Sequence, residues 1–301
     1  MPDKTVRLKL PSYGGQALIE GVLMRGSRYV AAAFRLPSGE IQVETEKLEG
    51  IYSSRIAKIP FLRGLILLWD ALGLGMRYIM KAANTQTGED EKIEGPQFIL
   101  TMIISFAIAI GLFFLAPAGL AALMEKVFSI GPFIGNLIEG IVRLILIVGY
   151  IWEIGKMPDI KRVFSYHGAE HKTINAFEAS ASLTPESVKQ FPLYHPRCGT
   201  GFLLILVIFS IILFSLLGPL PNIWLRFASR ILLIPILVMV AYEYMRFAAN
   251  NMHHPVLKYL SALNMSMQKL TTVEPDESML EVAITAFKAM YQLENDIKLA
   301  G

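Results

Sequence analysis

The stretch Phe98-Ile-Leu-Thr-Met-Ile-Ile-Ser-Phe-Ala-Ile-Ala-Ile-Gly-Leu-Phe-Phe-Leu-Ala-Pro-Ala-Gly-Leu-Ala-Ala-Leu-Met124 contains no charged side chain. About 20 apolar residues are enough for a helix to cross a bilayer, and so long a run is seldom a buried core helix. Residues 200–217 form a second uncharged run. The mean hydropathy of +0.47 excludes an ordinary soluble domain. The sequence therefore predicts an integral membrane protein.

Hydropathy and turn residues predict four spans, at 98–124, 133–155, 200–218 and 223–247. Pro117 predicts a kink in the first span. Glu139 and Arg143 lie four residues apart in the second span, so we expect them to pair on one face inside the bundle. For residues 200–247, a re-entrant hairpin of two shorter helices is the alternative.

The distribution of Lys and Arg predicts the orientation. These residues are abundant before the first span, in 156–199 and in the C-terminal tail, whereas the connections 125–134 and 218–222 hold only Lys126. We therefore expect a multi-pass protein of the inner or plasma membrane. Both termini and the 156–199 loop are predicted to be cytoplasmic.

Residues 1–58 are predicted to form a small, β-rich cytoplasmic module. The runs 29–34 and 40–45 alternate in part and flank the turn residues Pro37-Ser-Gly-Glu40, which together predict a β-hairpin. Residues 14–26 predict a further strand with glycines at its ends. The module is expected to lie outside the membrane region.

Residues 59–95 are predicted to form an amphipathic helix at the membrane surface and a polar linker. Arg63, Asp70 and Arg77 are seven residues apart, so a helix places them on one narrow stripe. A fifth span is the alternative for the helical part.

Residues 251–301 are predicted to form a cytoplasmic tail that ends in a helix. Leu280, Ile284, Phe287 and Tyr291 recur at helical spacing, and this stripe indicates packing onto the N-terminal module. The fold class expected for the chain is a mainly α, polytopic helical bundle, whose transmembrane region is 96–250, with a β-rich module and a C-terminal helix.

The motif Tyr166-His-Gly-Ala-Glu-His-Lys172 can carry chemistry. His167 and His171 are four residues apart, so a helix turns both imidazoles to one side, where they can hold a zinc ion or another divalent transition metal. Glu170 lies beside this pair and can take a proton from a metal-bound water. The order H-x-x-E-H is that of inverzincin metalloproteases, although a solvated helix with incidental histidines is the alternative.

Three more candidate ligands are expected on the same membrane face. His195 and Cys198 are three residues apart just before the third span, and Glu243 lies near the end of the fourth. Cys198 could instead be a small buried hydrophobe, and Glu243 could instead pair with an arginine. His253 and His254 are neighbours in sequence, point in different directions on a helix and are predicted to be interfacial.

Four motifs, in this order along the chain, resemble the bacterial YqhQ family of unknown function: Gly14-Gly-Gln-Ala-Leu-Ile-Glu-Gly-Val-Leu-Met-Arg-Gly26, Tyr166-His-Gly-Ala-Glu-His-Lys172, His195-Pro-Arg-Cys-Gly-Thr200 and Leu270-Thr-Thr-Val-Glu-Pro275. The resemblance covers nearly the whole chain. It implies a multi-pass membrane protein and a predicted metal-dependent enzyme, with the metal at His167, His171, His195 and Cys198, and it implies no particular substrate. Residues 251–265 depart from the family pattern, which argues against a role for His253 and His254.

Two functions compete on this evidence. The first is a membrane-embedded zinc hydrolase, such as a peptidase, that acts on a membrane protein or a peptide. The second is a scaffold or adaptor with a structural zinc, since four closed ligands make a structural site and three plus water make a catalytic one. A small transporter that uses Glu139 and Arg143 is a third, weaker hypothesis. Membrane lipids are expected partners, a homo-oligomer is compatible with the sequence, and the net charge of +3 without a basic block argues against nucleic acid.

Overall fold

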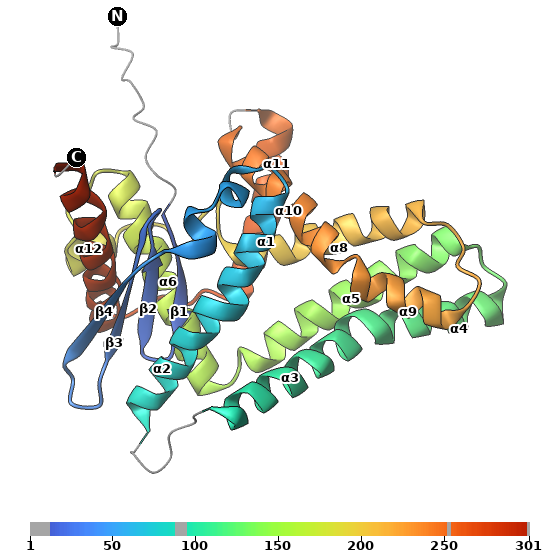
Figure 1. The fold of residues 1–301 in the computed structure, drawn as a ribbon, viewed down its shortest axis with the longest axis horizontal. Coiled ribbons are helices and arrows are strands. Elements are labelled where there is room, and N and C mark those ends of the chain that lie inside the picture. Colours follow the sequence, from blue (N-terminus) through green and yellow to red (C-terminus); the bar gives the residue numbers. More distant parts are fainter. Residues whose placement is uncertain (1–12, 88–94, 252–253, 300–301) are drawn as a thin grey trace, which may run out of the picture. The chain divides into compact units, whose positions relative to one another are not determined.

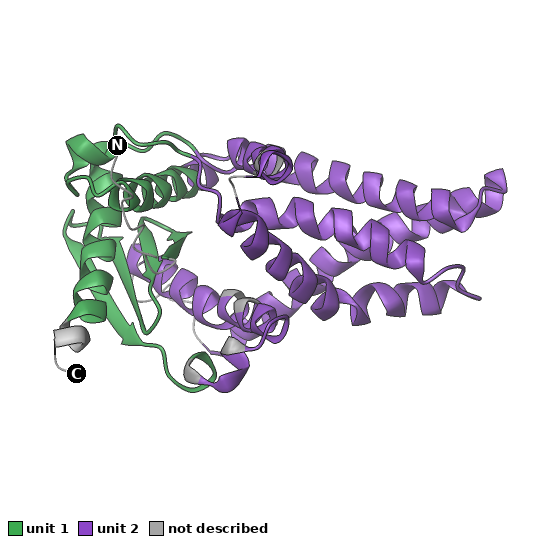
Figure 2. Ribbon diagram, turned by 90° about the horizontal axis from the view of Figure 1, so that it is seen from above, with its two compact units in different colours: residues 1–53, 162–193, 273–301 green, residues 54–161, 194–272 purple. Residues whose placement is uncertain are grey.

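The computed structural model describes residues 13–87, 95–251 and 254–299. The described chain is mainly helical and has one antiparallel sheet (Figure 1). It divides into two units, shown in green and purple in Figure 2: unit 1 comprises 1–53, 162–193 and 273–301, and unit 2 comprises 54–161 and 194–272. Segments that are far apart in the sequence therefore build each unit.

Unit 1 contains a four-stranded antiparallel sheet in chain order, with strands β1 (Gly14–Leu18), β2 (Gly21–Arg25), β3 (Tyr29–Arg35) and β4 (Ile41–Lys47). The predicted hairpin between 29–34 and 40–45 is confirmed as β3–β4. The prediction of one strand over 14–26 is wrong, because two strands pair there with Leu18 opposite Gly21. The turn between them places Glu20 at a φ of +49°, a conformation that Asn or Gly usually signals and Glu does not.

Helices α6 (Pro158–Glu178), α7 (Pro185–Val188) and α12 (Glu277–Leu299) contribute side chains to the core of unit 1. The predicted packing of the tail helix onto the module is confirmed, since α12 lies against β2 and β3 (Figure 1). Leu280 and Phe287 are fully buried, whereas Tyr291 is 36% exposed at the edge. The small side chains of Ala31 and Ala33 in β3 leave room for α12 to approach the sheet.

Unit 2 contains three helical runs that are long and apolar enough to cross a membrane. They are Pro96–Phe128, built from α3 (Pro96–Ile110), η5 (Gly111–Leu115) and α4 (Ala116–Phe128); α5 (Pro132–Ile154); and α8 (Gly199–Leu216). The helices α9 (Ile223–Leu232) and α10 (Ile234–Asn250) pass the same test together, with a bend of 44° between them, so the described residues give three or four candidate spans. Pro235 in the first turn of α10 explains the break, because it donates no backbone hydrogen bond to the preceding turn.

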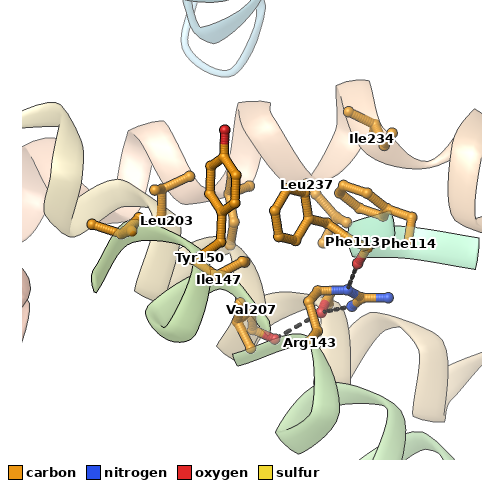
Figure 3. Close-up of a pocket in the computed structure, with 12 residues that line it drawn as sticks. Phe113, Phe114, Arg143, Ile147, Tyr150, Leu203, Val207, Ile234 and Leu237 are labelled. Carbon is orange, nitrogen blue, oxygen red and sulfur yellow. Dashed lines mark hydrogen bonds between the residues drawn. The ribbon is translucent and has the colours of Figure 1, made fainter. Parts of the chain in front are cut away.

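A π-helical turn, η5, lies just before Pro117, where the sequence predicts a kink. Proline has no N–H to donate to the carbonyl four residues earlier, which is that of Phe113. Arg143 Nε donates to this carbonyl instead, at 2.8 Å, and Arg143 Nη1 donates to Ser210 Oγ (Figure 3). The predicted pair is confirmed, since Arg143 Nη2 lies 2.7 Å from Glu139 Oε1. A cavity of about 260 Å³ with an apolar surface lies beside these residues.

The predicted amphipathic segment is helical as α1 (Leu62–Trp69), a π-helical turn η3 (Asp70–Gly75) and α2 (Met76–Gln86). The remaining short elements of unit 2 are η2 (Arg55–Lys58), α11 (Pro255–Ser266) and η6 (Met267–Leu270), and η1 (Gly50–Ser53) belongs to unit 1. Gly64 allows α1 to pack closely on α10, since a Cβ there would lie 3.0 Å from Met239 Cα. The position of α1 and α2 at a membrane surface stays a prediction.

Candidate metal centre

Helix α6 carries the H-x-x-E-H motif in the interior of unit 1. The helix begins at Pro158 and has Asp159 in its first turn, which are both favourable at a helix N-terminus. From Ser165 to Ala176 nearly every residue is buried. The motif is therefore not on a solvated helix, which was the alternative that the sequence left open.

The imidazoles of His167 and His171 lie side by side on α6, with ring centroids 4.4 Å apart and the rings inclined by 61°. His171 is 1% exposed, and its Nδ1 lies 2.5 Å from the carbonyl oxygen of Leu193. Because a carbonyl can only accept, Nδ1 carries a proton, so in the neutral ring Nε2 is the nitrogen that can bind a metal. A histidine that binds a metal is usually oriented in this way, by donating its other ring N–H to a carbonyl or carboxylate.

Glu170 is buried between α6 and strand β1, with an exposed fraction of 5%. The Gly15 N–H donates to its carboxylate, and a Cβ on Gly15 would lie 2.8 Å from Glu170 Cγ and 2.6 Å from the Leu23 carbonyl oxygen. Burial raises the pKa of the Glu170 carboxyl to about 7, while the charge of His167 and the Gly15 N–H act in the opposite direction. At neutral pH this carboxyl can therefore both accept and donate a proton.

Lys172 fixes the segment that approaches His171. Its buried ammonium donates to the carbonyl oxygens of Lys189 and Phe191, at 2.8 and 2.9 Å, and lies 2.7 Å from a carboxylate oxygen of Glu274. The chain from Lys189 to Leu193 is thereby held against α6. The sequence did not predict this role for Lys172, although the residue lies in the Tyr166–Lys172 motif, because a lysine on a helix is normally solvated.

Gly168 gives a structural reason for the second half of the Leu270–Pro275 motif. A Cβ at this position would lie 2.3 Å from the Val273 carbonyl oxygen, and Val273 N–H donates to the Phe164 carbonyl. The segment that starts at Val273 and includes Pro275 thus packs directly on the histidine helix. Its part of the Leu270–Pro275 motif is structural.

An ion pair between Glu20 and Arg162 holds α6 on the N-terminal side of the H-x-x-E-H motif. The Arg162 guanidinium donates to both carboxylate oxygens of Glu20, at 2.6 and 2.7 Å, and the Tyr166 hydroxyl donates to Glu20 at 3.1 Å. Hydrogen bonds from Arg162 hold the pKa of Glu20 below its usual range. The β1–β2 turn therefore anchors α6, which the sequence did not reveal.

His195 and Cys198 lie in unit 2, at the start of α8. The His195 backbone is held by Gln268, whose side chain accepts from the His195 N–H at 2.9 Å and donates to its carbonyl at 2.8 Å. Cys198 N–H donates to the same carbonyl, and Cys198 Sγ accepts from Thr200 N–H as the N-cap of α8. Both residues are largely buried, so neither is a surface residue in the described chain.

Glu243 lies elsewhere in unit 2, on α10. It forms an ion pair with Arg63 on α1 and accepts from the Phe61 N–H at 3.0 Å. The sequence anticipated an arginine partner without identifying Arg63. His254 is exposed, and His253 falls outside the described residues.

Comparison with known proteins places the chain in a family without assigning it an activity. The model of a family described as "Protein of unknown function (DUF1385)" matches residues 59–293. The "Uncharacterized protein YqhQ" of Bacillus subtilis (strain 168) is 34% identical, over 94% of this chain and 93% of its own length. No solved structure matches. The chain therefore belongs to the DUF1385 family and is similar to YqhQ.

Proposed function

We propose that this protein is a metal-dependent hydrolase of the membrane, with a zinc-type site built around His167 and His171. The observation that carries the proposal is the hydrogen bond from His171 Nδ1 to the Leu193 carbonyl, next to the His167 ring. It fixes the tautomer that offers Nε2 as a ligand, and this is the arrangement that metal-binding histidines need.

We assign the further ligands to His195 and Cys198 by continuity of the chain. Leu193 contacts His171, and His195 follows two residues later, which is at most about 7 Å of backbone. Cys198 is tied back to His195 by its own N–H. With either His195 or Cys198 as the third protein ligand, a zinc ion would keep one coordination position for water, whereas both together would close the site. Glu243 is omitted because Arg63 and the Phe61 N–H occupy its carboxylate.

In this proposal Glu170 is the general base. A bound zinc would supply a water of lowered pKa, and Glu170 would accept its proton because burial brings the carboxyl pKa near neutrality. A peptide or a membrane protein is the proposed substrate class, because H-x-x-E-H is an order used by metallopeptidases. The proposed topology has three or four spans with both termini and the metal site on the cytoplasmic side.

A structural metal is the second candidate, and one observation favours it. The Glu170 carboxylate lies against the backbone of Gly15 and is 5% exposed, so it already has a structural role at strand β1. If His195 and Cys198 both bind, the site has four protein ligands and is closed. The protein would then be a scaffold whose metal joins distant parts of the chain.

Metal analysis of four purified, chelator-free proteins separates these functions. The wild type should hold one transition metal per chain. His171→Ala should lose it, and the matched control His254→Ala, which changes an exposed histidine, should keep it. For a hydrolase, Glu170→Gln should keep its metal while in-cell complementation falls about 100-fold or more, the scale of general-base catalysis.

A Glu170→Gln protein that keeps its metal and complements fully would exclude the hydrolase and leave the scaffold. Wild-type protein without stoichiometric metal would exclude both functions.

A further inference from the structure

A cluster of buried charges occupies the helical bundle of unit 2, apart from the histidine motif. Glu139 on α5 is 1% exposed and lies within hydrogen-bond distance of three guanidinium groups. These belong to Arg143 at 2.7 Å, Arg230 at 2.7 Å and Arg226 at 3.3 Å. Arg226 also pairs with Glu125 at 2.8 Å. The cluster joins side chains from α4, α5 and α9, and Ser210 adds a contact from α8.

The charges of the cluster do not cancel. Three arginines face two carboxylates, Glu125 and Glu139, which leaves one positive charge among these five buried or nearly buried side chains. Arg230 lies over the ring of Phe214, 4.2 Å from its centroid, which offsets part of the cost. An unpaired buried cation is nevertheless expensive, and a nearby anion would neutralise it.

A small polar cavity lies beside the cluster at one end of the bundle. It has a volume of about 60 Å³, larger than the roughly 10–15 Å³ that one water needs. Its lining comes from the ends of α4 and α5, the α8–α9 connection and α9: Glu125, Pro132, Asn136, Gly218, Pro219, Leu220, Arg226 and Arg230. Because Pro132 begins α5 and lines the cavity, the N-terminal end of that helix also borders this space and would favour an anion there.

Two buried polar atoms of the lining residues have no hydrogen-bond partner in the described chain. They are Arg226 Nε, a donor, and Glu125 Oε1, an acceptor. A simple halide would satisfy only the donor. A ligand that has an anionic oxygen and a hydroxyl proton would satisfy both, and planar guanidinium groups match oxyanions well.

We propose that this cavity binds a phosphate-type oxyanion through Arg226 and Arg230, with Glu125 accepting from its hydroxyl group. Inorganic hydrogen phosphate carries both groups on one ion, and phosphatidylglycerol offers a phosphodiester oxyanion together with the hydroxyls of its glycerol headgroup. The site is independent of the proposed metal centre, since none of its residues belongs to the metal-ligand set.

Binding of inorganic phosphate and retention of phospholipid test the proposal on the full chain in detergent. Equilibrium dialysis with labelled phosphate measures the free ion, and native mass spectrometry after extraction from vesicles of phosphatidylglycerol and phosphatidylcholine measures the lipid. We expect one phosphate, or one phosphatidylglycerol, per chain. Arg226→Gln should weaken that binding about 10- to 100-fold, which is the usual loss for a charge-assisted hydrogen bond.

Lys126→Gln is the matched control, because it removes a neighbouring positive charge on α4 that does not line the cavity. It should bind as the wild type does. Arg226→Lys keeps the charge without the guanidinium fork and should bind more weakly than the wild type, so a folding defect of Arg226→Gln cannot hide the answer. Thermal unfolding of each variant reports on folding.

Binding of neither probe by the wild type would overturn the proposal, because the cavity would then hold water only. Equal binding by folded Arg226→Gln, Arg226→Lys and Lys126→Gln would overturn it too. Loss of lipid but not of free phosphate in Arg226→Gln would support it and identify a headgroup site, and the reverse result would support a site for the free ion.

Discussion

The histidine region of unit 1 and the arginine cluster of unit 2 both bury polar groups, but they satisfy them differently. In unit 1 the partners are mainly backbone groups: His171 bonds a carbonyl, Lys172 bonds two, and Glu170 accepts from a strand N–H. In unit 2, Glu139 is surrounded by side chains that carry the opposite charge. Backbone partners are fixed by the fold, whereas side-chain partners depend on one another. We therefore expect the first region to be sensitive to changes in backbone packing and the second to fail when one charge is removed.

The largest expected effect comes from Glu139→Gln. This change leaves three buried guanidinium groups without their shared carboxylate, and breaking a buried ion pair typically costs about 3–5 kcal/mol. The thermal unfolding midpoint in detergent should fall steeply. Glu153→Gln, on the same helix, breaks an exposed pair with Lys156 and should change the midpoint little. Equal stability of the two variants would contradict the expected dependence of unit 2 on its buried charge cluster.

A steric test of the unit 1 site uses two adjacent glycines. Gly15→Ala places a Cβ 2.6 Å from the Leu23 carbonyl oxygen and against Glu170, so we expect a loss of about 1–3 kcal/mol. Gly14→Ala meets nothing within 4 Å and should be close to neutral. Chemical unfolding measures both, and metal content shows whether the metal site fails with β1. A neutral Gly15→Ala would contradict the close packing of Glu170 on this strand.

The smallest expected effect is the pH dependence that comes from Glu20. Arg162 lowers its pKa in the folded state, so the pair stabilises the protein above the unfolded pKa of Glu. This contribution disappears as pH falls through the lowered folded pKa. Because the pair is partly exposed, it is worth less than about 1 kcal/mol.

Unfolding of wild type and Glu20→Gln should therefore differ at pH 7 and converge towards pH 3. A difference that grows as pH falls would have the wrong sign for a lowered pKa. The expected convergence would sharpen the comparison, because it measures a partly exposed ion pair of unit 1 against the buried polar groups of that unit.

Local sequence signals predicted much of the fold and part of the candidate site. The structure confirms the helix predicted from the uncharged run at 98–124, a signal that depends only on the composition of one segment. It also confirms the helix predicted from the spacing of Leu280, Ile284 and Phe287, which depends only on the period of one helix. The four-residue spacing of His167 and His171 likewise puts two imidazoles side by side on one helix, since such neighbours always share a face.

Contacts between residues that are far apart in the sequence could be predicted only in part. The pair Glu139–Arg143 was predictable because it spans one helical turn, but Arg226 and Arg230 approach the same carboxylate from α9. Glu243 gave no sign that Arg63, 180 residues away, would bind it. The Glu20 turn was missed because its left-handed backbone is imposed by the pairing of β1 with β2.

The sequence by itself determined which segments are helical and apolar, and which residue types lie one turn apart, because these properties depend on the backbone repeat alone. Only the tertiary structure decided that Gly15 lies against Glu170, that Lys172 holds the Lys189–Leu193 segment and that three arginines surround Glu139. Such contacts depend on the path of the chain between distant residues, and short-range periodicity carries no information about that path.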